Sequence, residues 1–471
     1  INIFYVSFLI FNFIIFIYLL LYKMSTKSYR SILPNNVPST GKVSFARGNP
    51  IITVTLGRQD AMLDLSSLRL SGNLDIWSNA AGTQHPTAGG GGVAARAVEL
   101  QGSHKLGIYS CIDQLVFRHA ETKQVIEHIR HYGRFMSSYM PVMAGMQDVA
   151  GHLSKSALIM PNYQAYRDNV IRNTRNSVFC IPLPAGLTLG VDKLPLDKVP
   201  LEIEIHLAPD SQFFYSSDAT TTNISNAFYE LSGLELTCEI ETGVKSPDKG
   251  VLDFNSITSY FSTLESTNSI INFNLGLSKV LASFVNFVPA NFVNNLSQDG
   301  FLTYMPTLKP NAAADPKDQN TLAGVANLDT ISFLRNGERF PSSFEVESVY
   351  DATTNATSVV DPQVIKSFLG AIIPERVHTR TTASPATTNR GYTGNQNALT
   401  GYRYVPDAGA VYGVGVLYDM LDSEGVDFSS SQFSIQMKNG LVDGNPISAY
   451  LFIKSKVVVA WSGDMGVQVV M

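Results

Sequence analysis

Residues 194–207 read LPLDKVPLEIEIHL, a proline-bounded approach followed by a run that alternates between apolar and polar side chains. The apolar residues of that run are Leu201, Ile203, Ile205 and Leu207, and the polar residues between them are Glu202, Glu204 and His206. Because successive side chains of a strand point to opposite faces, the run predicts a strand with one buried and one wet face. Such a strand belongs in a sheet that packs against a second layer.

Strand signals of this kind recur along the chain, whereas helix signals are few. The strands that they predict are 51–56, 61–70, 111–117, 179–183, 228–243, 271–277, 330–347 and 448–461. One helix is predicted at 124–140 from the spacing of its apolar residues. A second is predicted at 361–373, with Asp361 as the N-cap and Pro362 in the first turn. The sequence therefore predicts a predominantly β protein.

The composition narrows the class of protein. Charged residues make up only 15% of the 471 residues, which is low for a solvated monomer, and aromatic residues make up 10%, which favours strands over helices. A net charge of −5 gives no reason to expect nonspecific nucleic-acid binding, which needs a basic face. The three cysteines, Cys111, Cys180 and Cys238, are far apart. Their spacing excludes a disulfide framework and suits a reducing compartment, and we expect them to be small buried residues.

The two halves of the chain share one layout. In the first half, residues 187–210 lead into the strand at 228–243, and in the second half residues 416–441 lead into the strand at 448–461. Each copy has an apolar entry, an acidic turn, an alternating strand and a closing strand. This repeat predicts two similar β domains in tandem. We place them at residues 46–247 and 248–471, after an N-terminal arm at residues 24–45.

Residues 1–23, INIFYVSFLIFNFIIFIYLLLYK, are long and apolar enough to span a bilayer. Their composition, almost wholly Ile, Phe, Leu, Tyr and Asn, is also what AT-rich untranslated sequence encodes. Met24 follows directly and opens a polar stretch typical of the start of a soluble protein. We interpret this hydrophobic leader as read-through upstream of Met24, with a genuine membrane segment as the alternative.

Motifs that carry chemistry are few. The run GGGG at 89–92 lacks the Lys-Ser/Thr of a phosphate loop, and the chain has no GxSxG, HExxH or EF-hand motif. Glu127, His128 and His131 could bind a metal ion, although an interfacial helix face explains them more simply.

Two pairs of glutamates could supply an acid and a base, and three sequons could carry glycans. The glutamates are Glu202 with Glu204 and Glu235 with Glu239, and the sequon asparagines are Asn223, Asn295 and Asn355. Outward-facing strand positions explain the glutamates more simply, and the sequons matter only if the chain is secreted. We therefore expect no catalytic, cofactor or metal site and no enzymatic activity.

Two longer stretches carry a family resemblance. They are CIDQLVFRHAETKQVIEHIRHYGRFMSSYMP at 111–141 and IPLPAGLTLGVDKLPLDKVPLEIEIHLAPDSQFFY at 181–215. The chain resembles the double jelly-roll major capsid proteins of eukaryotic DNA viruses, above all the compact group in polinton-like viruses and virophages. The resemblance spans roughly residues 44–471, although the second half matches by layout more than by residues and the leader is foreign to the family.

This resemblance implies an all-β fold of two tandem eight-stranded antiparallel jelly rolls with a few short helices in the connections. It implies a major capsid protein whose homotrimers are pseudo-hexameric capsomers of an icosahedral shell. The expected partners are the chain itself, neighbouring capsomers and penton or minor capsid proteins, with no sequence-specific nucleic acid. Membrane contact is expected only if residues 1–23 are genuine. The expected location is the virion, after assembly in the host cytoplasm or nucleus.

Surface roles and a rival function complete these expectations. We expect residues 79–105, 305–328 and 375–407 to form an outer tower or contacts between capsomers. Residues 212–215 and 284–292, rich in aromatic side chains, are candidate trimer contacts. The alternative function is that of a membrane-anchored or secreted β-sandwich protein that binds carbohydrate or acts as an adhesin. A β-sandwich enzyme is a further rival.

The read-through interpretation of the leader makes a direct prediction. A chain that starts at Met24 should be soluble and able to assemble, because the polar stretch after Met24 already suits a soluble N-terminus. Expression of residues 24–471 beside residues 1–471, followed by negative-stain microscopy, checks this. Loss of folding or of particles on removal of residues 1–23 would show that the segment is a working part of the protein.

Overall fold

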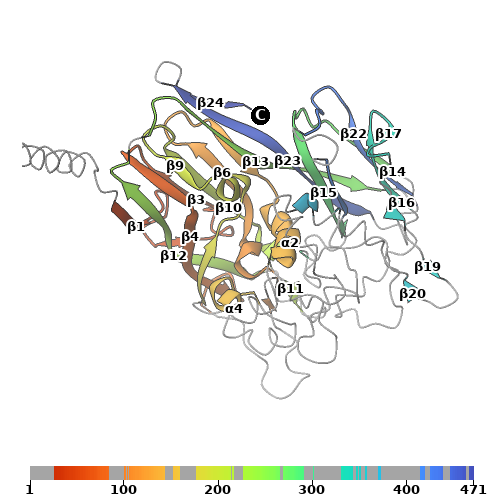
Figure 1. Cartoon of the computed structure of the whole chain (residues 1–471). Coiled ribbons are helices and arrows are strands. Elements are labelled where there is room, and N and C mark those ends of the chain that lie inside the picture. Colours follow the sequence, from red (N-terminus) through yellow and green to blue (C-terminus); the bar gives the residue numbers. More distant parts are fainter. Residues whose placement is uncertain are drawn as a thin grey trace, which may run out of the picture.

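The structure is a computed structural model. It describes residues 26–83, 100–101, 103, 106–143, 152–159, 177–213, 215–216, 226–244, 246–265, 269–290, 301, 330–342, 346–347, 350–351, 356–357, 367, 370–372, 414–418, 425–438, 446–462 and 466–470. Figure 1 shows two groups of strands standing side by side. No helix among the described residues is long and apolar enough to cross a membrane.

The first group of strands forms two antiparallel sheets. Sheet 1 has the order β1 (Thr26–Ile32), β12 (Phe228–Thr242), β4 (Ala61–Trp77), β8 (Ser177–Pro182), with β2 (Lys42–Val43) beside β12 and β9 (Lys193–Pro195) beside β4. Sheet 2 has the order β3 (Ile51–Leu56), β10 (Leu201–Leu207), β6 (Ile112–His119), β7 (Val125–Ile129). A separate two-stranded sheet joins β5 (Leu100–Gln101) and β11 (Tyr215–Ser216). The predicted arm thus contributes β1 and β2 to sheet 1.

The second group repeats this arrangement. Sheet 3 has the order β13 (Gly250–Leu264), β23 (Ile447–Ser462), β15 (Val280–Pro289), β21 (Val414–Leu417), with β24 (Gly466–Val470) beside β23. Sheet 4 has the order β14 (Ser269–Phe273), β22 (Phe433–Lys438), β16 (Thr330–Arg335), β17 (Glu338–Arg339), with β18 (Val346–Glu347) beside β16. The short strands β19 (Tyr350–Asp351) and β20 (Ala356–Thr357) pair with each other.

The strand orders define the fold. When the eight main strands of each group are numbered along the chain, both groups read 1-8-3-6 in one sheet and 2-7-4-5 in the other. This antiparallel two-sheet order is that of an eight-stranded jelly roll. The expectation of two tandem jelly rolls is therefore confirmed, and we call the two groups the first and second roll. The residue limits of the two domains remain a prediction.

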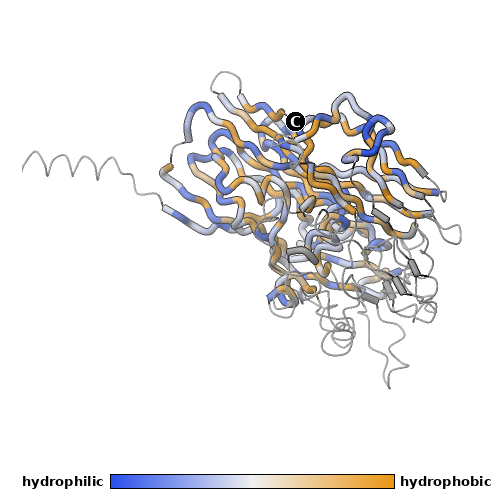
Figure 2. Tube along the Cα trace, turned by 45° about the vertical axis from the view of Figure 1, so that its right-hand side comes forward, coloured by the Kyte–Doolittle hydropathy of each residue, from blue (hydrophilic) through white to orange (hydrophobic). Residues whose placement is uncertain are grey.

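Alternation of side chains explains why these segments form strands. Along β10 the apolar residues Leu201, Ile203 and Ile205 are fully buried, as the sequence predicts. The colours of Figure 2 alternate in the same way along many strands of the first roll. Glu202 departs from the pattern, because it is buried although it lies on the polar face.

The helix predicted at 124–140 is wrong in its first part. Residues 125–129 form β7, which pairs with β6, and the helix α2 (Tyr132–Met143) begins only after His131. Val125 and Ile129 lie four residues apart and suit a helix, but pairing with β6 decides for the strand. His131 has φ of 53°, which ends the strand and turns the chain into α2.

The remaining helices of the described residues are short and lie in connections, as expected. They are η2 (Gly107–Cys111), α4 (Ser154–Ser156), α6 (Gly186–Gly190) and α7 (Asp210–Phe213). Of the helix predicted at 361–373, residues 370–372 are helical, while Asp361 and Pro362 lie outside the described residues.

Two further expectations are corrected. Cys111 and Cys238 are buried, but Cys180 is exposed because it lies on the outward side of the edge strand β8. The trimer contact expected at 284–292 is wrong for its described part, because Phe284 and Phe287 are fully buried within the chain. Strand β15 lies between two neighbours in sheet 3, so its aromatic side chains pack internally. The predicted loops at 305–328 and 375–407 lie outside the described residues, and of the loop at 79–105 only residues 79–83, 100–101 and 103 are described.

The central strand β10 offers a test of the core. Replacing the fully buried Ile203 with alanine should lower the free energy of unfolding by about 2–5 kcal/mol, because a cavity replaces packed methyl groups. Thr53→Ala, on the polar face of the neighbouring strand, should change it by about 0.5 kcal/mol or less. Chemical denaturation measures both, and equal losses would contradict the assigned faces.

Candidate functional site

The two rolls meet where an edge strand of each comes together. Strand β7 ends sheet 2, β13 ends sheet 3, and the short helix α6 packs against β13. Helix α2 lies between the two rolls (Figure 1). We call this contact the roll junction.

The carboxylate of Glu127 on β7 lies at the centre of the roll junction. Its Oε1 accepts hydrogen bonds from the backbone N–H of Gly186 at 3.0 Å and of Ile257 at 2.8 Å. Its Oε2 accepts one from the N–H of Leu187 at 2.8 Å. Helix α6 needs this partner because its N-cap residue, Ala185, has no side-chain acceptor. One side chain therefore joins β7, α6 and β13.

Burial dominates the electrostatics of this carboxyl group. Glu127 is only 1% exposed, and burial raises its pKa from 4.5 to about 7. The backbone N–H groups of Leu187, Ile257 and Gly186 and the hydroxyl of Ser256 act in the opposite direction, because they favour the charged form. The Glu127 carboxyl group in the roll junction therefore changes its protonation near neutral pH.

Helix α6 approaches β13 so closely that glycine is required. A Cβ atom on Gly186 would lie 2.1 Å from the carbonyl oxygen of Asn255 and 2.7 Å from Oε1 of Glu127. A Cβ atom on Gly190 would lie 2.9 Å from Cβ of Phe254. The absence of side chains lets the helix N-terminus reach both the carboxylate and the second roll.

Helix α2 adds a buried polar contact and an aromatic contact. The Ser138 hydroxyl donates to Oδ1 of Asn286 at 2.5 Å, and Nδ2 of Asn286 donates to the carbonyl oxygen of Arg134 at 2.9 Å. The ring centroid of Phe135 lies 6.0 Å from that of Phe452 and 6.4 Å from that of Phe284. These contacts place α2 firmly on sheet 3.

His131, which precedes α2, packs against aromatic rings of the second roll. Its ring centroid lies 5.1 Å from that of Tyr450 and 5.9 Å from that of Phe261. Burial lowers its pKa, so the imidazole is neutral at physiological pH. The guanidinium of Arg134 lies 4.9 Å from the Tyr450 ring, a cation–π distance.

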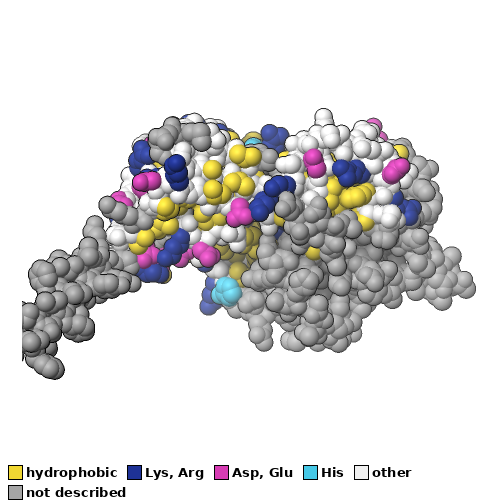
Figure 3. Space-filling view, turned by 45° about the horizontal axis from the view of Figure 1, so that its top comes forward, with side chains coloured by type: hydrophobic (Ala, Val, Ile, Leu, Met, Phe, Trp, Pro, Cys, Tyr) yellow, Lys and Arg dark blue, Asp and Glu magenta, His cyan; other side chains and the backbone are white. Residues whose placement is uncertain are grey.

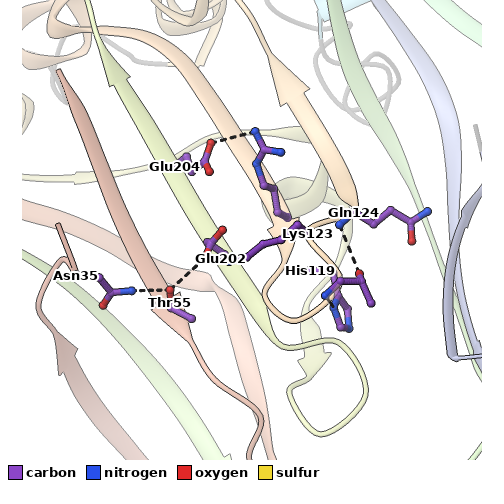
Figure 4. A network of polar contacts seen from close by, with 9 residues as sticks. Asn35, Thr55, His119, Lys123, Gln124, Glu202 and Glu204 are labelled. Atoms are coloured by element: carbon purple, nitrogen blue, oxygen red, sulfur yellow. Dashed lines mark hydrogen bonds and ion pairs between the residues drawn. The ribbon is translucent and has the colours of Figure 1, made fainter. Parts of the chain in front are cut away.

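The polar face of sheet 2 carries a separate network (Figure 4). Glu202 accepts hydrogen bonds from Lys123 at 2.6 Å and from the Thr55 hydroxyl at 3.3 Å. Thr55 in turn accepts one from Nδ2 of Asn35 at 2.6 Å. Glu204 forms an ion pair with Arg118 at 3.1 Å. These contacts cross between strands and hold the glutamates in ion pairs.

His128 belongs to this face. Its Nε2 lies 2.8 Å from Oε1 of Gln114 on β6. Burial, followed by the charges of Arg130, His206 and Arg118, lowers the pKa of His128 to about 4. The ring is therefore neutral and suited to hydrogen bonding across the strands.

The candidate residues from the sequence do not form a metal site or an acid–base pair. Glu127 and His128 point to opposite faces of β7, and His131 contacts the second roll. Among the described residues no three ligands gather for a metal ion. Glu235 and Glu239 lie on β12 in sheet 1, apart from Glu202 and Glu204 in sheet 2. Glu239 pairs with Lys27 at 2.7 Å. The sequon residues Asn223, Asn295 and Asn355 lie outside the described residues.

The sequence singled out Glu127 but not its partners in the roll junction. Asn286 carries a usable signal, because it is the one amide side chain in the mostly apolar run VLASFVNFVP at 280–289, where Ser283 is the other polar residue. Gly186 carries none, because a glycine near a helix start has many explanations.

The buried carboxyl predicts a pH-dependent stability. In the folded chain Glu127 keeps its proton up to about pH 7, whereas the unfolded chain releases it near 4.5. The contribution of Glu127 to the free energy of unfolding is therefore complete below pH 4.5. It falls as pH rises from 4.5 through 7, and the total loss is about 3 kcal/mol. Glu127→Gln, which has no proton to release, should lack this loss. Denaturation of both proteins from pH 4 to 8 measures the difference, and parallel profiles would contradict the prediction.

Comparison with known proteins agrees with this geometry at the level of the fold. No family model and no curated protein matches the chain. A chain in the cryo-EM structure of the Sputnik virophage is similar with a TM-score of 0.51 and 10% identity, over 95% of this chain and 88% of that chain. A chain of the PBCV-1 virus capsid has a TM-score of 0.48 and 13% identity, over 96% and 97% of the two chains. The mavirus major capsid protein has a TM-score of 0.44 and 9% identity, over 94% and 90%.

Among these three, only the Sputnik chain has a TM-score above 0.5. At 10% identity this likeness shows a shared fold alone, and the coverage of 95% includes both rolls. Together with the strand orders, this likeness confirms the resemblance to virophage-type double jelly-roll proteins as a resemblance of fold.

Proposed function

We propose that the chain is the major capsid protein of an icosahedral DNA virus, with a structural role and no enzymatic one. Three copies form a pseudo-hexameric capsomer, to which each chain supplies two of six sides. The observation that supports this best is the repetition of one strand order in two rolls joined by a buried junction. A rigid pair of like modules is what a nearly sixfold building block needs from each of three chains.

The fold comparison supports the same role. The Sputnik chain, which covers 95% of this chain, comes from a virophage structure determined by cryo-EM. The polar faces of the first roll agree with a structural role, because Glu204 and Glu239 form ion pairs with neighbouring strands and Glu202 forms one with Lys123 in the turn between β6 and β7.

Exposed apolar side chains support self-association. Tyr29 is 81% exposed, Leu33 69% and Val178 66%. In Figure 3 hydrophobic side chains lie exposed between charged ones on the upper face of the molecule. Tyr29 lies on the edge strand β1 and Leu33 directly follows it, and an exposed edge strand is a template for association with another chain.

The wider assembly follows as part of this proposal. Trimers contact neighbouring capsomers and penton or minor capsid proteins, and the mature location is the virion after assembly in the host cytoplasm or nucleus. The rival reading, a membrane-anchored or secreted carbohydrate-binding or adhesin protein, rests on residues 1–23 and on the three sequons. All of these lie outside the described residues, so no described feature favours it.

The proposal predicts a stable homotrimer. Each interface should bury more than about 2,000 Å², the range of obligate assemblies, so that trimers persist at micromolar concentration. Analytical ultracentrifugation of the full chain measures the oligomeric state, and negative-stain microscopy should show particles of hexagonal outline. A monomer with no trimer at micromolar concentration would refute the capsid function.

A further inference from the structure

The roll junction joins two particular positions of the jelly roll. In the first roll it uses β7, which is strand 5 of that roll and an edge of its 2-7-4-5 sheet. In the second roll it uses β13, which is strand 1 of that roll and an edge of its 1-8-3-6 sheet. Because both rolls have the same strand order, the chain holds one more copy of each position. These are β17 in the second roll and β1 in the first.

Strand 1 of the first roll, β1, and strand 1 of the second roll, β13, differ in what covers them. On β13, Ile257 is 1% exposed and its N–H is bound by Glu127, while the Ser259 hydroxyl donates to the carbonyl oxygen of Arg130 at 2.7 Å. On β1, Tyr29 is 81% exposed, and among the described residues the strand pairs with β12 alone. An exposed edge strand of seven residues is a ready template for another chain.

Strand 5 of the first roll, β7, and strand 5 of the second roll, β17, differ in the same way. Glu127 on β7 is buried by the second roll, whereas both residues of β17, Glu338 and Arg339, are exposed. Strand β17 follows a tight turn in which Asn336 and Gly337 have φ of 52° and 84°. The hairpin of β16 and β17 therefore presents a carboxylate at the outer edge of sheet 4.

Strands β1 and β17 lie at opposite sides of the chain in Figure 1. They cannot meet within one chain, but they can meet head to tail between two copies. A head-to-tail contact of this kind closes into a ring when the rotation between copies allows it.

We propose that β1 of one copy docks beside the β16–β17 hairpin of a second copy and so repeats the roll junction between chains. This inference rests on the proposed function and names the surface that forms the capsomer. Tyr29 is the anchor of the contact, since large exposed aromatic residues carry much of the energy of such interfaces. Glu338 faces Arg30, an exposed cation of β1 whose Nη1 donates to Oε1 of Gln59 at 2.8 Å, while the other cation of the strand, Lys27, pairs with Glu239.

The docked contact differs from the roll junction in one respect. Glu127 is buried among backbone N–H groups, whereas Glu338 and Arg30 lie on exposed strands. An ion pair at such a position is screened by salt. Trimers should therefore dissociate more readily as salt is raised, while the junction inside each chain stays closed.

The first test compares two exposed apolar residues in the full chain. Tyr29→Glu should raise the trimer dissociation constant by at least about tenfold, because it places a charge where the second copy docks. Ile270→Glu is the matched control, since Ile270 is 54% exposed on β14, a strand with no counterpart in the roll junction. Sedimentation velocity measures the constants, and unchanged thermal melting shows that both variants fold. Equal weakening by the two substitutions would overturn the inference.

A charge exchange tests the orientation of the docked strands. Glu338→Lys and Arg30→Glu should each weaken the trimer, and the double variant should recover part of the loss because the two charges again attract. If the wild-type chain forms trimers and Tyr29→Glu and Glu338→Lys form them equally well, the inference fails and the proposed function stands. If the wild-type chain is a monomer, the proposed function fails and the inference fails with it.

Discussion

A single buried carboxyl group, that of Glu127, bridges the two halves of this protein at the centre of their contact. Glu127 binds three backbone N–H groups that have no other acceptor in their own elements: two at the start of α6 and one on the edge of sheet 3. Each of these groups would cost roughly 1–3 kcal/mol if it were left buried without a partner. Glu127 thus joins two edge strands, β7 and β13, in one defined contact. Left exposed, such edges could pair with other chains.

This contact is specific because its donors are backbone groups at fixed positions. An apolar patch in the same place could slide, whereas three N–H groups aimed at two oxygens define both distance and direction. The glycine at 186 is the necessary counterpart, because any side chain there would strike the second roll. Aromatic packing of α2 against Phe284 and Phe452 then supplies apolar burial around the polar centre. The outer faces of the sheets carry ion pairs between a partly exposed cation and a less exposed carboxylate, such as Lys27 with Glu239 and Arg118 with Glu204, and each pair contributes little to stability.

The two rolls show how little sequence likeness a shared fold needs. Both have the strand order 1-8-3-6 and 2-7-4-5, yet the segments that form it differ in length and composition. Strand β7 has five residues and follows a loop, while its counterpart β17 has two and follows a tight turn. Alternating apolar side chains and antiparallel pairing are common to both rolls, whereas strand lengths and turns differ between them.

The sequence by itself determined the strands whose side chains alternate, since that pattern is local. Strands β3 and β10 have the predicted bounds for this reason, and the repeated layout predicted two similar β domains. Residues 125–129 were wrongly predicted as helix, because their apolar spacing suits a helix as well as a strand. Only pairing with β6 decides that they form a strand. Glu127 could likewise be singled out as a possible metal ligand, but its actual partners could not be found, because they lie 59 to 130 residues away along the chain. The tertiary structure alone brings those N–H groups to one carboxylate, because hydrogen-bond geometry depends on distances in space that a linear pattern does not encode.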